Sequence, residues 1–210
     1  MRFPIAREAF LFVVPLGIAA AVLFALGLPI PGAVCALVAA YVVFFFRDPK
    51  RTPPEDAALV VAPADGLVVG VTEAEEPDYL GGSAVRVSIF MRLWDVHMTY
   101  APAAGTVEHV AHRPGRFGSA GLSKASERNE ANSIGMKSAG GRLLFRQIAG
   151  MIARRIVCRV GPHDEVRCGQ RVGLIMFGSR VDVFLPSKYA VLVRKGQFVR
   201  GARSPIARAQ

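Results

Sequence analysis

The chain has 210 residues, a formal net charge of +10 and a hydrophobic content of 52%. This length accommodates one sizeable domain, or one domain and an anchor, and the charge favours an anionic partner such as nucleic acid or acidic lipid. The three cysteines, Cys35, Cys158 and Cys168, have neither paired spacing nor a zinc-ligand pattern. We therefore expect a reducing compartment, no disulfide framework and no metal site.

Two apolar segments near the N-terminus predict a helical membrane hairpin. Residues 10–28 are uncharged and apolar, and a spanning helix needs about 20 such residues. A Pro-Ile-Pro-Gly turn at 29–32 separates them from a shorter run, 33–46, which either spans tilted or re-enters. Basic residues flank only the outer ends, so we expect both ends on the cytoplasmic face of the cell membrane. A signal peptide is the alternative, but the apolar region of a signal peptide is shorter than residues 10–28, and a signal peptide is not followed by a second apolar run.

The polar, proline-containing segment 52–56 predicts a linker, so we place a domain boundary between residues 1–51 and 52–210. Beyond it, short apolar or alternating runs separated by turn residues are typical of strands. We expect a loop at the acidic residues 73–78 and a long loop over the polar, glycine- and serine-rich residues 112–140. The predicted strands are 59–62, 67–71, 85–90, 143–149 and 152–160.

Weak internal repeats accompany these strands. The sequence PADGLV at 63–68 is similar to PAAGTV at 102–107, and VRCGQRV at 166–172 is similar to VRKGQFV at 193–199. Each is typical of a strand, a glycine turn and a returning strand. Such units resemble the flattened β-sandwich of biotinyl and lipoyl carrier domains. We therefore predict a mainly β, barrel-sandwich hybrid domain built by duplication, preceded by the membrane hairpin.

A Gly-Ser pair lies between two apolar strand patterns, a continuous one at 174–177 and an alternating, half-buried one at 181–185. One interpretation of Gly178-Ser179 is a β-bulge or turn. The other is a self-cleavage site. In that reaction the Ser179 hydroxyl attacks the Gly178 carbonyl, the peptide becomes an ester, and elimination leaves a new N-terminal group.

Further residues could support such chemistry. Asp65 either bonds the backbone of its own turn or acts as a base near Ser179. Asp95 and His97 would share one face of a strand, and His97 is either structural or a proton-transfer group. The many basic residues after Ser179 form a solvated face or contact lipid phosphate. Nucleic acid is not expected as a partner, because the sequence has no basic patch with interleaved aromatic residues but does have a predicted membrane anchor.

Together these motifs resemble the proenzymes of the phosphatidylserine decarboxylase family, in the short bacterial and archaeal type. The resemblance covers nearly the whole chain in order. It is carried by Phe46-Arg47-Asp48-Pro49 after the hairpin, Pro63-Ala64-Asp65-Gly66, Asp95-Val96-His97 followed by Ala101-Pro102, and Phe177-Gly178-Ser179-Arg180.

The resemblance implies a proenzyme that cuts itself between Gly178 and Ser179. The products would be a β chain, 1–178, and an α chain, 179–210, which form a heterodimer. A higher oligomer of this heterodimer is also possible. Ser179 would become the covalent pyruvoyl cofactor. An imine between that group and the serine headgroup of phosphatidylserine, drawn from the membrane lipids, would accept the electrons left when CO2 departs, giving phosphatidylethanolamine.

The resemblance also implies roles for the other residues. Asp65 helps to activate Ser179, His97 transfers a proton during decarboxylation, and Asp95 orients His97. Longer members of the family carry a second histidine at the position of Tyr100. Whether His97 serves in both steps, or Asp65 acts alone in cleavage, therefore stays open.

Two other functions remain as alternatives. A carrier-like β-sandwich without catalysis would need a modifiable lysine, for which Lys137 is the nearest candidate. A pyruvoyl decarboxylase acting on an ether analogue of phosphatidylserine is the second.

Overall fold

The computed structural model describes residues 4–115, 129–150, 155–176 and 179–210. Two compact units divide the chain, Met1–Lys50 and Arg51–Gln210. The first is helical and the second contains the strands, so the prediction of a mainly β protein with N-terminal apolar helices is confirmed.

The helical unit contains a short 3-10 helix, η1 (Arg7–Ala9), followed by α1 (Phe10–Ala25) and α2 (Pro29–Phe45). The two long helices are separated at Gly27, which has a φ of +73° that favours glycine. The predicted break at the prolines is therefore displaced: α2 begins at Pro29, because proline suits the first turn of a helix. The helical stretch Arg7–Ala25 is long and apolar enough to cross a membrane, whereas α2 is shorter.

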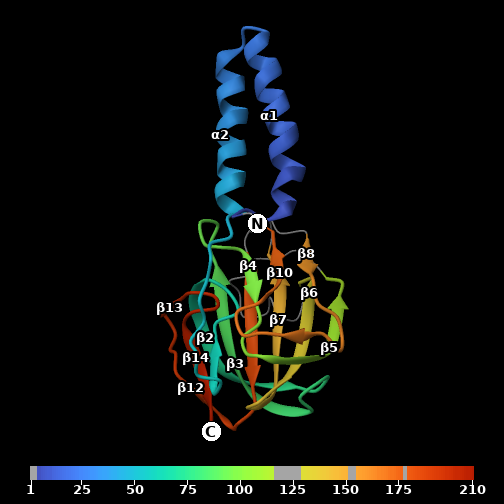
Figure 1. Ribbon diagram of the computed structural model, residues 1–210, viewed down its shortest axis with the longest axis vertical. Helices are drawn as coiled ribbons and strands as arrows, with labels where there is room; N and C mark the ends of the chain where they lie inside the picture. The colour runs from blue at the N-terminus through green and yellow to red at the C-terminus, as the bar shows by residue number, and fades with distance from the viewer. Residues whose placement is uncertain (1–3, 116–128, 151–154, 177–178) are drawn as a thin grey trace. The chain divides into compact units, whose positions relative to one another are not determined.

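The strands of the second unit pair antiparallel in three sheets, with the orders β13-β2-β3-β11-β7-β6-β5-β9, β1-β14-β12 and β4-β10-β8. The eight-stranded sheet is strongly curled and forms a half-barrel (Figure 1). Among the described residues the strands are β1 (Leu59–Val61), β2 (Gly66–Glu76), β3 (Gly82–Met91), β4 (Met98–Tyr100), β5 (Gly105–Arg113), β6 (Ala131–Ser138), β7 (Gly141–Ala149), β8 (Ile156–Cys158), β9 (Glu165–Val166), β10 (Arg171–Ile175), β11 (Ser179–Leu185), β12 (Tyr189–Val191), β13 (Phe198–Val199) and β14 (Pro205–Ala209).

Two predicted loops are corrected by the structure. β2 continues through most of the acidic segment 73–78, where it pairs with β3. β6 lies within the predicted long loop 112–140, of which residues 116–128 are outside the described part. Its side chains are mostly small and polar, but Ile134 and Met136 are fully buried between β5 and β7. Tertiary pairing therefore decides a strand that the weak local pattern did not indicate.

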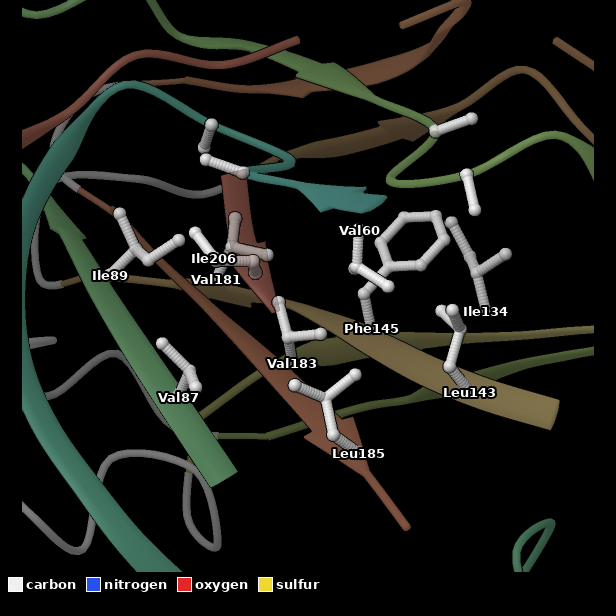
Figure 2. Packing of buried hydrophobic residues seen from close by; sticks show 14 of the residues in the cluster. Val60, Val87, Ile89, Ile134, Leu143, Phe145, Val181, Val183, Leu185 and Ile206 are labelled. Carbon is white, nitrogen blue, oxygen red and sulfur yellow. The ribbon is translucent and has the colours of Figure 1, made fainter. Parts of the chain in front are cut away.

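The core lies inside the curled sheet, and β11 runs through its centre. Val181, Val183 and Leu185 project from β11 toward Phe145 and Ile206, as Figure 2 shows. All seven residues of β11 are buried, so the prediction of a half-buried strand is wrong. The opposite face of β11 is covered too, because Phe184 packs against Ala84 and Leu144.

Equivalent hydrogen-bond patterns support the predicted duplication. β13 pairs with β2 so that Val199 faces Gly66, and β9 pairs with β5 so that Val166 faces Gly105. A Cβ would lie 2.3 Å from a carbonyl oxygen at Gly66 and 2.1 Å from one at Gly105, so both turns need glycine. The structural counterpart of Val166 is therefore Val199, and not Val193 as the sequence repeat predicted. The biotinyl or lipoyl assignment stays a prediction.

Candidate active site

Ser179 is the first residue of β11 and is fully buried. It pairs with Met91 of β3 on one side and Ala149 of β7 on the other. Its hydroxyl donates to the Met91 sulfur at 3.1 Å. β10, which ends at Ile175, belongs to a different sheet from β11. Gly178, the other half of the predicted cleavage site, lies outside the described residues.

Asp65 lies in the turn just before β2 and is held by distant parts of the chain. Its Oδ1 accepts the Gly201 backbone N–H at 2.7 Å, and its Oδ2 accepts Nη2 of Arg51 at 2.7 Å. The side chains of Arg51 and Asp65 are only 8% and 9% exposed. Burial raises the pKa of the Asp65 carboxyl, although the Arg51 guanidinium partly opposes this effect. A carboxyl with a raised pKa is a better proton acceptor than an ordinary aspartate.

Asp95 and His97 lie in the connection between β3 and β4, and not on a strand as predicted. The Asp95 carboxylate accepts the backbone N–H of Arg92 and two guanidinium N–H groups of the same residue, at 2.9–3.0 Å. His97 is 2% exposed, and its Nδ1 lies 3.0 Å from the Asp95 carbonyl oxygen. Since a carbonyl only accepts, Nδ1 carries a proton, and in the neutral form of the ring the lone pair lies on Nε2. Asp95 therefore contacts His97 through its main chain, and its carboxylate is bound to Arg92.

The strand order brings these residues to one end of the curled sheet. Met91, the last residue of β3, pairs with Ser179, and β2, which follows Asp65, is the other neighbour of β3. The connection that carries Asp95 and His97 starts directly after Met91. The Asp95 charge also raises the pKa of Asp65, as expected for neighbouring carboxyl groups.

Two backbone hydrogen bonds close this end of the unit. The Tyr100 N–H donates to the Pro63 carbonyl at 2.8 Å, which joins β4 to the Asp65 turn, and the Ile175 N–H donates to the His97 carbonyl at 3.2 Å. Tyr100, which by the resemblance lies where longer family members carry a second histidine, is fully buried. Its ring lies against Gly201, where an added Cβ would be 2.8 Å from Cδ2.

Several supporting residues were not predicted. The sequence places Arg51 at the boundary of the predicted membrane segment, and no local signal connects it with Asp65. The spacing of Arg92 and Asp95, three positions apart in a turn, could have indicated their ion pair. The amide of Gln147 joins the two sheets, since it donates to the Thr99 hydroxyl at 3.2 Å and accepts from Asn132 at 3.1 Å. Within the described residues, no group of three or more His, Cys, Asp or Glu side chains could hold a metal ion.

A buried serine that starts a central strand, with carboxyl and imidazole groups at the same sheet end, is suited to a proenzyme that modifies its own chain. Comparison with known proteins supports that class. The family model described as "Phosphatidylserine decarboxylase" matches residues 38–207. The chain therefore belongs to the phosphatidylserine decarboxylase family.

Three curated relatives, each named "Phosphatidylserine decarboxylase proenzyme", agree with this assignment. One from Carboxydothermus hydrogenoformans is 46% identical over 207 residues, covering 96% of this chain and 95% of the relative. One from Desulfotalea psychrophila is 42% identical over 169 residues, covering 80% and 79%. One from Rickettsia rickettsii is 42% identical over 205 residues, covering 96% and 88%.

Proposed function

We propose that this chain cuts itself between Gly178 and Ser179 and then decarboxylates phosphatidylserine to phosphatidylethanolamine and CO2 with a pyruvoyl group derived from Ser179. The supporting observation is the buried Ser179 hydroxyl at the start of β11, at the sheet end that also holds Asp65 and His97. Family membership supplies the substrate class.

The self-cleavage step uses only groups of this chain and one water molecule. The Ser179 oxygen attacks the Gly178 carbonyl carbon while its proton passes to a base, for which we assign Asp65. The C–N bond breaks, the nitrogen is protonated, and an ester replaces the peptide. Loss of the Ser179 Cα proton then expels Gly178 as a carboxylate. The remaining enamine takes up water and loses ammonia, which leaves a ketone.

The surroundings of Ser179 fit the product of this step. A pyruvoyl group lacks the Ser179 amino and hydroxyl groups and ends in a methyl, so it needs no more space than the serine. The Met91 thioether, which accepts a hydrogen bond from the Ser179 hydroxyl, is also a suitable apolar neighbour for a methyl group. Burial of Ser179 keeps bulk water away from its hydroxyl group.

The pyruvoyl group would supply a ketone that condenses with the substrate amine and accepts the electron pair released with CO2. We assign His97 to proton transfer at the substrate carbon, because Nε2, the ring nitrogen that does not bond the Asp95 carbonyl, would take up a proton from solvent and donate it to the carbon that CO2 has left. Arg92 and Asp95 hold the connection that carries this ring. We assign them to positioning, because their mutual ion pair occupies the Asp95 carboxylate.

The cut chains should stay together as a heterodimer. β11 begins at Ser179 and lies between β3 and β7 in the centre of the sheet, so the α chain, 179–210, keeps its ladder to the β chain after cleavage. We further propose that the enzyme acts at the cytoplasmic face of the cell membrane, with α1 in the bilayer. No observation favours the carrier alternative, since Lys137 lies within β6 and not at a hairpin tip.

Intact mass measurement of the purified protein tests this proposal. The wild type should give two chains, 1–178 and 179–210, with the smaller one blocked at its N-terminus and reactive toward a hydrazine. Ser179→Ala should remain one inactive chain, whereas Ser83→Ala, in the exposed start of β3, should be cleaved normally. Two chains from Ser179→Ala, or an uncut and active wild type, would contradict the proposal.

A further inference from the structure

The connection that carries Asp95 and His97 also exposes large apolar side chains. Trp94 is 59% exposed and Leu93 is 37% exposed, directly beside the buried Asp95. Phe198 of β13 is 41% exposed. The guanidinium carbon of Arg92 lies 5.3 Å from the centre of the Trp94 ring and 5.0 Å from that of Phe198. One cation thus joins aromatic rings from two distant segments in a single area, which we call the Trp94 surface.

Basic residues lie close to Phe198 in the sequence. The turn before Phe198 contains the exposed Arg194 and Lys195, and Leu192 on the same turn is 51% exposed. Backbone bonds of 2.8 Å between Val68 of β2 and the residues of this turn hold it on the sheet. Tryptophan and leucine beside arginine and lysine suit a bilayer interface, where rings lie at headgroup level and cations attract anionic lipid.

The rest of the chain favours a membrane over another protein as the occupant. α1 is long and apolar enough to cross a bilayer, and Arg51, which the Asp65 ion pair holds in the β unit, follows α2 after a short stretch of chain. A protein partner would also need to tolerate the surplus positive charge of the turn, whereas anionic headgroups are complementary to it.

We propose that the Trp94 surface docks on an anionic lipid bilayer, with Trp94 and Leu93 at the level of the headgroups. Docking would place the connection bearing Asp95 and His97 at the membrane surface, where a lipid headgroup can reach it without leaving the bilayer. This second consequence rests on the proposed function, but the docking itself does not.

Trp94 is the only tryptophan of the chain, so its fluorescence reports on this surface alone. The full-length protein is reconstituted in vesicles of phosphatidylcholine and phosphatidylglycerol whose acyl chains carry bromine at shallow or deep positions. We expect bromine to quench Trp94 emission, more strongly when it is shallow than when it is deep, and we expect the emission maximum to move to shorter wavelength than in the protein held in detergent.

A matched control moves the tryptophan to the other end of the same hairpin. In Trp94→Phe/Asp78→Trp the only tryptophan lies in the exposed turn between β2 and β3, at the strand ends opposite to Met91. Bromine should leave its emission unchanged. Equal quenching at both positions, or none at Trp94, would overturn the proposal. If Trp94 emission is not quenched by brominated lipid but changes with protein concentration, the Trp94 surface instead binds a second copy of the chain, and the proposal is overturned.

Activity provides an independent readout. Leu93→Ser and Trp94→Ser should lower the turnover of phosphatidylserine in vesicles, and should leave unchanged the turnover of a short-chain, monomeric phosphatidylserine and the extent of self-cleavage. An equal loss on both substrates would instead indicate damage to the site. A wild type that is quenched by brominated lipid but decarboxylates neither substrate would contradict the proposed function and leave the docking intact.

Discussion

Buried carboxyl groups with assigned partners define the site at the scale of single residues. Asp65 is bound by Arg51 and by the backbone of Gly201, and Asp95 is bound by Arg92. The two carboxyl groups nevertheless differ in their surroundings, because Asp95 accepts three hydrogen bonds from Arg92, whereas Asp65 accepts one each from Arg51 and Gly201. Burial raises the pKa of the Asp65 carboxyl. This asymmetry favours Asp65 as the base for the Ser179 hydroxyl and Asp95 as a structural anion.

The pKa of Asp65 predicts how self-cleavage depends on pH. The ionised carboxyl accepts the proton, so the cleavage rate falls as the pH falls through the pKa of Asp65. Burial raises this pKa above its ordinary value of 3.8, so the rate should decline at a higher pH than an exposed aspartate would allow. The rate of two-chain formation over a pH series measures the midpoint, and near-ultraviolet circular dichroism excludes unfolding at each pH. A midpoint at or below 3.8 would exclude Asp65 as the base.

Gly201→Ala should slow self-cleavage without unfolding the protein. The new Cβ would lie 2.8 Å from the Tyr100 ring and 3.1 Å from the Ala64 carbonyl carbon, so residue 201 must move. Its N–H then shifts away from Asp65, which weakens one of the two bonds that hold the carboxyl. The cleavage rate and the melting temperature are compared with those of Gly70→Ala, where a Cβ meets nothing within 4 Å. Equal rates in the two variants would show that the Gly201 contact is dispensable.

At the scale of elements, β11 begins at Ser179, the proposed reactive residue, and also contributes side chains to the core. One face carries Val181 and Val183 into the apolar cluster, while the other carries a buried ion pair. Arg180 donates from Nε to Asp182 at 2.6 Å and from Nη2 to the Ser88 hydroxyl at 2.7 Å. Both faces thus hold Ser179 at a set position between β3 and β7.

Breaking this pair should destabilise the protein more than removing it entirely. Asp182→Ala leaves the Arg180 charge buried without its carboxylate, and such a loss costs about 3–5 kcal/mol in the free energy of unfolding. The double variant Arg180→Met/Asp182→Leu buries no charge and should recover most of that loss. Urea unfolding in the uncut Ser179→Ala background, in detergent, measures both. A single variant as stable as the double one would contradict this account of β11.

At the scale of the whole molecule, the curled sheet encloses one apolar cluster to which most strands contribute. Phe145 of β7 lies 1% exposed within it, surrounded by residues from several strands (Figure 2). The site sits at one end of this cluster, so its geometry depends on a core assembled from both halves of the duplicated chain.

Phe145→Ala should lower the free energy of unfolding by about 3–5 kcal/mol, because it removes a ring from a closely packed interior and leaves a cavity. Leu192→Ala, which truncates a side chain that is 51% exposed, should change it by less than about 0.5 kcal/mol. Urea unfolding of the uncut Ser179→Ala protein again provides the measurement. Similar losses in the two variants would mean that the cluster is not the main source of stability.

The local pattern of the sequence by itself determined the apolar helices, most strands and the Gly178-Ser179 pair. Each of these depends on residues close together in the chain, such as the alternation at 181–185 or the turn glycines at Gly66 and Gly105. Where the local pattern was weak, as in β6, or where burial of both faces came from other strands, as in β11, the prediction failed. A single stretch of chain carries no information about what will cover it.

Only the tertiary structure decided how the site is held together. Arg51 and Gly201 approach Asp65 from positions 14 and 136 residues away, and Met91 meets Ser179 from 88 residues away. It also decided that Asp95 turns its carboxylate to Arg92 and its carbonyl to His97. Motifs reveal which chemical groups are available. The partners and burial of these groups, and hence their pKa values, follow from the strand order. The reason is that electrostatic interactions and hydrogen bonds act through space and not along the chain.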